Sequence, residues 1–279
     1  MELTTQQRAI QQNKLNQRQR SATPSIGLLA LPFLLFLLVP LLALLLQTRP
    51  AALLVNLANP QVIQAIQLSL TTTTLSTLLT LLLGTPLAYW LARQRFRGRA
   101  AIDTLLDLPM VLPPSVAGIA LLVAFGRRGL LGAYLNAAGI DIAFTSTAVV
   151  LAQMFVAAPF YIKAAIAGFG GVDQDLEKAA ALDGADGWGV FRYVTMPLAW
   201  PMLFGGAVMG WARALGEFGA TIIFAGNFPG RTQTMPLAIY IGFEVDLNIA
   251  LTLSVILLVI SFFVLLLVKG ILGQRIGAV

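Results

Sequence analysis

The feature that most constrains this chain is a series of six long apolar stretches. Each holds about the 20 mostly apolar residues that an α-helix needs to cross a lipid bilayer. They run over residues 26–46, 66–91, 105–125, 147–168, 199–224 and 249–268. The pattern predicts an all-α fold, a polytopic membrane protein with six transmembrane helices.

The composition excludes several other classes of protein. Hydrophobic residues make up 58% of the chain and charged residues only 11%, whereas soluble domains carry about 25% charged residues. A net charge of +6 would suit nucleic acid, but the basic residues flank the apolar stretches, as membrane topology requires. We therefore expect contact with the lipid bilayer and no nucleic-acid binding.

The chain contains no cysteine and no histidine. This excludes disulfides, Cys/His metal sites and histidine-based acid–base chemistry. We expect no metal site, no cofactor and no catalytic residue.

Two of the apolar stretches contain residues that disturb a helix. The second opens with the polar run 71–74, but threonine hydroxyls can bond back to helix carbonyls and so permit a helix. The third contains Pro109, Pro113 and Pro114, so we expect a kink there. These prolines either produce a simple kink or break the helix and so help to shape a path through the membrane.

The basic residues also predict the orientation. If the N-terminus is inside, twelve lysines and arginines fall on the cytoplasmic side and four outside, so both termini are predicted to be cytoplasmic. The cluster from Arg93 to Arg99 is interpreted as a topology anchor, while Arg127 and Arg128 break the rule. Residues 1–25 are polar and basic, which predicts a disordered cytoplasmic tail rather than a cleaved signal. Residues 26–279 form the predicted membrane domain.

The segment 171–197 between the fourth and fifth stretches is predicted to be cytoplasmic and to hold a short amphipathic helix. Asp173 or Asp175 can serve as its N-cap, and Gly184 is a natural stop. The residues Trp188, Phe191 and Val194 offer an apolar face at helical spacing. One alternative is an ordinary interfacial helix that packs on lipid headgroups.

This segment resembles the cytoplasmic signature of binding-protein-dependent ABC importer permeases. The family pattern is Glu-Ala-Ala, three residues, Gly, nine residues, a β-branched residue, one residue, an apolar residue and Pro. Lys178 occupies the Glu position, with Glu177 directly before it. The resemblance implies a type I ABC importer (MetI-like) permease fold with residues 171–197 as the coupling segment. The residues that it assigns to coupling with an ATPase are Glu177, Ala179, Ala180, Gly184, Val194 and Pro197.

A second resemblance concerns residues 212–221 (ARALGEFGAT), 225–227 (AGN) and 229–234 (PGRTQT). These are similar to permeases of the molybdate type and less closely to sulfate and thiosulfate permeases. The resemblance covers about residues 60–275. It implies a homodimer of permeases in a bacterial inner membrane, with two ABC ATPase subunits and a periplasmic molybdate- or oxyanion-binding protein. No Walker A pattern occurs in the chain, so another chain must bind the ATP, and this chain is expected not to be an enzyme.

Arg213 and Glu217 are expected inside the fifth helix, four residues apart, where they can neutralise one another. They are either a structural ion pair or part of the translocation path, where Arg213 would attract a dianion. Polar residues beyond them are expected either to contact a docked binding protein or to lie in a solvated outer loop: Thr221, Asn227, Thr232, Gln233 and Thr234.

Two other functions stay open. An ion-coupled secondary transporter would place carboxylates inside the membrane, and Glu217 is the one firm candidate in this sequence. A membrane enzyme is disfavoured because the chain has no histidine and no G-x-S-x-G motif.

Overall fold

The computed structural model describes residues 29–276, with side chains as far as residue 270. The chain divides into two compact units between Arg49 and Pro50. The first contains one described helix, Leu29–Gln47, of mean hydropathy 2.9. This helix agrees with the first predicted span, whereas the predicted tail 1–25 lies outside the described residues.

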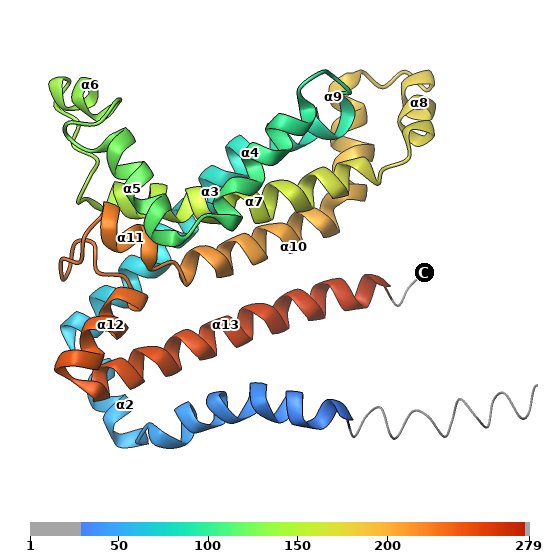
Figure 1. Ribbon diagram of the computed structural model, residues 1–279. Helices are drawn as coiled ribbons and strands as arrows, with labels where there is room; N and C mark the ends of the chain where they lie inside the picture. The colour runs from blue at the N-terminus through green and yellow to red at the C-terminus, as the bar shows by residue number, and fades with distance from the viewer. Residues whose placement is uncertain (1–28, 277–279) are drawn as a thin grey trace, which may run out of the picture. The chain divides into compact units, whose positions relative to one another are not determined.

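The second unit is built from helices alone over its described residues, which confirms the all-α prediction (Figure 1). In chain order these are α2 (Pro50–Leu57), α3 (Pro60–Arg93), α4 (Arg99–Val111), α5 (Pro114–Phe125), α6 (Gly132–Ala137), α7 (Ser146–Gly170), α8 (Gln174–Leu182), α9 (Gly187–Val190), the π-helix η1 (Phe191–Thr195), α10 (Met196–Leu215), α11 (Gly219–Phe224), α12 (Met235–Val245) and α13 (Leu247–Ile276).

Several of these helices can cross a membrane. Among the described helices, four are long and apolar enough, and the bent pair α4–α5 would make a fifth. The four are Leu29–Gln47, Pro60–Arg93, Ser146–Gly170 and Leu247–Gly270. The predicted span 199–224 is instead divided into α10 and α11 by a break at Gly216. The polytopic architecture is therefore confirmed, while the count of six spans stays a prediction.

The kink predicted for the third apolar stretch is a sharp break. The chain bends by 115° between helices α4 and α5. Leu112 is extended, with ψ of 134°, because a residue before proline avoids the helical region. Pro113 and Pro114 have no N–H to continue the ladder of α4, and Pro114 begins α5 instead.

The threonine run in α3 is helical, as expected. The Thr71 and Thr72 hydroxyls donate to the carbonyls of Gln67 and Leu68 at 2.7 and 2.8 Å. Thr73 accepts a hydrogen bond at 3.1 Å from the Nε2 of Gln153 in α7. The polar run therefore satisfies itself along α3 and also joins α3 to α7.

Helices α3, α7 and α10 pack into one core, and glycines set their spacing. A Cβ added at Gly206 of α10 would lie 2.5 Å from the Cβ of Ala164 in α7, and one at Gly168 would lie 2.8 Å from Met202. Small residues allow this close backbone approach. In the same way, a Cβ at Gly219 of α11 would lie 2.5 Å from Pro114 of α5.

Figure 1 shows how this packing separates the functional regions of the second unit. Helices α8 and α9 lie at one end, beyond the long arms of α7 and α10, whereas α6 and α11 lie at the other end. The break between α4 and α5 lies between these ends.

Candidate functional site

Helix α8 begins where the sequence places its cap. The Asp173 carboxylate accepts a hydrogen bond at 2.9 Å from the backbone N–H of Asp175. Asp175 and Glu177 lie in the first turn, where the helix dipole favours negative charge. Asp173 is therefore the N-cap, and Asp175 is not.

Gly184 ends α8, as predicted. Its backbone φ is +95°, a conformation that glycine adopts without steric cost. The N–H of Ala185 bonds to the carbonyl of Ala180 at 3.0 Å, and that of Gly184 bonds to Ala181 at 3.1 Å. This is the Schellman arrangement, which satisfies carbonyls that the last helical turn leaves free.

The surface of α8 is almost wholly exposed. No residue of the helix is buried; Ala179 is exposed and Ala180 is half-buried. Leu182 is 89% exposed, and Trp188 of α9 is 65% exposed. Exposed apolar side chains such as Leu182 and Trp188 are typical of a surface that contacts another protein.

Glu177 is the residue of α8 that faces the rest of the unit. Its Oε1 lies 2.5 Å from Nη2 of Arg93, at the end of α3, and 2.5 Å from the hydroxyl of Thr195 in η1. The Arg93 and Glu177 side chains are only 12% and 16% exposed. Arg93 was predicted to be part of a topology anchor, and its contact with Glu177 was not predicted.

A second ion pair of α8 points to solvent. The Lys178 ammonium lies 2.8 Å from Asp175 Oδ1. It lowers the pKa of Asp175 below its ordinary value, and the same hydrogen bond raises the pKa of Lys178. Both side chains are at least 70% exposed, so the pair contributes little to stability.

The predicted apolar face of this segment is divided between two directions. Phe191 points inward, with its ring 5.0 Å from that of Tyr89 and 6.2 Å from that of Phe169. Trp188 stacks on Phe191 but stays exposed. Val194 is half-buried in η1, and the exposed Pro197 opens α10.

Arg213 and Glu217 form the predicted ion pair, with Arg213 Nη1 and Glu217 Oε2 2.9 Å apart. The expectation that both lie inside one helix is wrong, because α10 ends at Leu215 and Glu217 follows the break. Glu217 is 1% exposed, and its Oε1 accepts from the N–H of Ala220 at 2.8 Å. It therefore also caps the first turn of α11.

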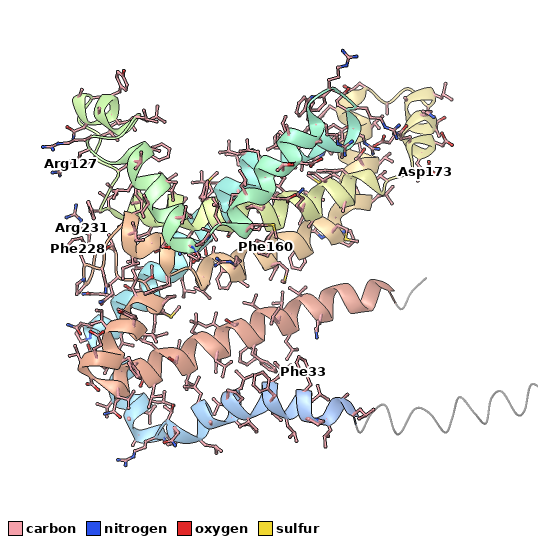
Figure 2. All side chains as sticks on the ribbon, viewed as in Figure 1. Phe33, Arg127, Phe160, Asp173, Phe228 and Arg231 are labelled. Carbon is pink, nitrogen blue, oxygen red and sulfur yellow. The ribbon has the colours of Figure 1, made fainter. Side chains whose placement is uncertain are left out.

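Arg213 opens into a pocket of about 300 Å³ beside the α4–α5 break. Phe160, at the centre of Figure 2, is one of the α7 residues in its wall. Among the lining residues Arg213 is the one that carries a charge: Pro109, Met110, Val111, Leu112, Pro113, Pro114, Val156, Phe160 and Arg213. Arg213 is thus the charged group of this wall, and Glu217 balances its charge at 2.9 Å.

A further charged cluster joins α4 to α7. Lys163 Nζ lies 2.9 Å from Asp107 Oδ1 and 3.6 Å from Asp103 Oδ1, and Arg99 is 3.8 Å from Asp103. This cluster was not predicted. The available signal was Lys163, a cation inside an apolar stretch, which requires a nearby anion.

Of the five polar residues expected near the outer loop, Asn227 and Gln233 are half-buried and the three threonines differ from both expectations. Thr221, Thr232 and Thr234 are completely buried, so they can neither contact a docked protein nor be solvated. The Thr232 hydroxyl accepts from the N–H of Phe228 at 3.0 Å and thereby closes the loop. Figure 2 shows Phe228 and Arg231 at the surface instead, at the end of the unit opposite Asp173.

These features can be compared with known proteins. Residues 84–277 match the family described as "Binding-protein-dependent transport system inner membrane component". The match covers most of the chain, including α8, the ion pair and the pocket. The chain belongs to this family. It is a multi-pass inner-membrane protein and the transport component of an import system, which confirms the predicted resemblance.

Individual molybdenum permeases are also similar to this permease in sequence. It is 43% identical over 237 residues to the "Molybdenum transport system permease protein ModB" of Mycobacterium tuberculosis, covering 85% of the permease and 90% of that protein. It is 44% identical over 178 residues to the ModB protein of Escherichia coli K12, covering 63% and 78%.

Solved structures agree on the fold of the permease. A chain of a bacterial alginate ABC transporter in complex with a periplasmic protein matches with a TM-score of 0.71 at 20% identity, covering 94% of the permease and 97% of that chain. A chain of the MetNI methionine ABC transporter matches with a TM-score of 0.57 at 16% identity, covering 76% and 95%. The predicted type I importer fold is therefore confirmed.

Proposed function

We propose that the permease is the membrane-spanning subunit of an ATP-driven importer that moves molybdate into the cytoplasm. The observation that carries this proposal is the 43% identity to a molybdenum permease over 85% of the chain. The spacing of the proposed coupling segment, in which Lys178 stands in place of the family's Glu, and the charged pocket support it. Tungstate and sulfate are related tetrahedral oxyanions, and a sulfate or thiosulfate permease is the nearest alternative.

The proposed assembly contains two copies of the permease, two ABC ATPase subunits and a periplasmic oxyanion-binding protein. The exposed face of α8, with Ala179, Leu182 and Trp188, would seat in the ATPase subunit. When ATP closes the ATPase pair, α8 would move and the helical bundle would switch by rigid-body rocking. The permease would bind and release the anion and perform no covalent chemistry.

The proposed path passes the pocket beside the α4–α5 break. Arg213 would attract the dianion there, because a cation in a partly enclosed site interacts more strongly than in bulk water. Glu217 would hold the guanidinium in place through its 2.9 Å contact. The negative charge of Glu217 would also weaken binding of the anion, so the permease would release the anion rather than retain it tightly.

The proposed orientation places α8 and both termini in the cytoplasm. It rests on the excess of lysine and arginine in the segments assigned to that side. The α6 end of the second unit would then face the periplasm, where a binding protein docks.

The decisive experiment is uptake of labelled molybdate and labelled sulfate in cells that lack this chain, complemented with the permease. We expect molybdate uptake that requires the ATPase subunit and that excess sulfate does not abolish. Sulfate uptake without molybdate uptake would favour the sulfate alternative. Uptake by the permease alone, without an ATPase, would favour an ion-coupled transporter and overturn the proposal.

A further inference from the structure

One carboxylate oxygen of α8 joins three elements of the permease. Oε1 of Glu177 accepts hydrogen bonds from Arg93 and from Thr195, each at 2.5 Å. Arg93 is the last residue of α3, and Thr195 is the last residue of η1. Arg93 also donates to the carbonyl of Val172 at 3.4 Å, just before α8. We call Arg93, Glu177 and Thr195 the α8 junction.

The junction is largely shielded from solvent, whereas most of α8 is exposed. Thr195 is completely buried, and the Arg93 and Glu177 side chains are 12% and 16% exposed. No residue of α8 is buried, so apolar packing cannot fix this helix firmly to the unit. Hydrogen bonds to a charged carboxylate are stronger than those between neutral groups. The junction is therefore the strongest described attachment of α8 to α3 and to the segment that leads into α10.

The backbone at Thr195 has an unusual conformation. Residues Phe191–Thr195 form a π-helix, and the N–H of Met196 bonds to the carbonyl of Phe191, five residues earlier. Single π-helical turns are rare and occur often at functional sites. This turn runs without a break into α10, whose 20 residues span about 30 Å at 1.5 Å per residue. The other end of α10 carries Arg213.

We infer that Arg93 and Thr195 are positioning residues that fix the coupling helix α8 to α3 and α10 through Glu177. A displacement of α8 would then be carried along α10 to the pocket at Arg213. This inference rests on the proposed function. It adds Arg93, which lies outside the coupling segment, and Thr195, at a position that the family pattern leaves unspecified. Without the junction, α8 would move on its Gly-containing connections while α10 stayed behind.

The test compares Thr195→Val, which keeps the branched shape but removes the hydroxyl, with Thr195→Ser, which keeps the hydroxyl. Each permease is purified with its ATPase subunits and placed in proteoliposomes with the oxyanion-binding protein. We expect Thr195→Val to reduce the molybdate taken up per ATP hydrolysed by about fivefold or more, as for loss of a typical coupling between sites. Thr195→Ser should restore coupling.

The matched control is Thr104→Val. This hydroxyl is exposed and donates only to the Ala100 carbonyl of its own helix, so uptake per ATP should stay at the wild-type value. Equal coupling in Thr195→Val and the wild type would overturn the inference alone. A wild type without ATP-dependent uptake would instead overturn the proposed function.

A second measurement keeps the inference testable if Thr195→Val assembles poorly. The chain has no cysteine, so spin labels can be attached at Gln174→Cys in α8 and Trp200→Cys in α10. Both positions are exposed, and neither is among the residues proposed to seat in the ATPase subunit. With an intact junction, the distance between the labels should be the same with and without ATP. In Arg93→Gln the distance distribution should broaden when ATP is added. A change of this distance in the otherwise wild-type permease would show that α8 and α10 move independently, and would overturn the inference.

Discussion

At Gly184 the backbone, and not the available space, restricts substitution. A Cβ there would meet no atom within 4 Å, but φ is +95°. The effect of a substitution at this position therefore depends on how well the new residue tolerates the left-handed region. Asn enters that region more readily than a β-branched residue does. The end of α8 depends on this single conformation.

We predict that Gly184→Val weakens the last turn of α8 by more than about 1 kcal/mol and lowers ATP-driven uptake, whereas Gly184→Asn keeps most of it. Uptake is measured at equal amounts of inserted permease. Equal activity of the Val and Asn variants would contradict a role for the glycine conformation.

The ion pair at the pocket gives a second prediction. Arg213→Gln alone leaves the buried Glu217 without its cation, which should destabilise the permease by about 3–5 kcal/mol and lower its melting temperature in detergent. Adding Glu217→Gln should recover most of the stability. If Arg213 attracts the anion, the double variant should still transport poorly. Wild-type uptake by the double variant would instead identify the pair as a structural lock.

We predict that the exposed pair Asp175–Lys178 does not make uptake depend on pH. The pKa of Asp175 is lowered, so its contribution is lost only as the pH falls below the ordinary value of 3.8. The pKa of Lys178 is raised, so its contribution is lost only above 10.5. Between these limits, Asp175→Asn should not change the pH profile of uptake. A shifted profile would show that a partner contacts Asp175.

At the scale of elements, the two prolines at the α4–α5 break hold the pocket open. Replacing Pro113 and Pro114 by Ala restores the missing N–H groups and lets α4 continue. We predict that this closes the pocket and lowers the reactivity of a Phe160→Cys variant with a small charged thiol reagent. Pro86→Ala, inside α3 and outside the wall of this pocket, is the control and should leave the reactivity unchanged.

Local signals were sufficient to predict several elements. The cap at Asp173, the stop at Gly184 and the break near Pro113 each depend on a residue's own backbone preference. The end of α10 was not predicted. The four-residue spacing of Arg213 and Glu217 suggested one continuous helix, because the two side chains pair even across the break. Gly216 between them was a visible signal for the end of the helix.

Contacts between distant residues could not be predicted in this way. Arg93 and Glu177 are separated by 84 positions, and Lys163 is 60 positions from Asp103. Helical periodicity shows which face of a helix is polar but not which partner it meets. For the same reason, the threonines of the outer loop were expected at the surface, while the fold buries them.

At the scale of the whole molecule, the orientation can be tested directly. Single cysteines at Leu182 of α8 and at Tyr134 of α6 replace side chains that are 89% and 77% exposed, at opposite ends of the second unit. In intact cells with a permeable outer membrane, an impermeant thiol reagent should label Tyr134→Cys and not Leu182→Cys. Labelling of Leu182→Cys from outside would contradict the proposed topology and the coupling role of α8.

The break between α4 and α5 also has a consequence for solvent. Pro113 and Pro114 have no N–H, so the carbonyls of Pro109 and Met110 lack the partners that an unbroken helix provides. The Pro113 carbonyl accepts from the N–H groups of Val116 and Ala117 instead. Hydrocarbon has no donors to offer them, and non-helical backbone at membrane depth is tolerated only inside protein or beside water. Because these residues line the pocket at Arg213, the break favours water over lipid on that side. An anion that reaches Arg213 would arrive with part of its own hydration shell, and the permease would not have to remove all of its bound water.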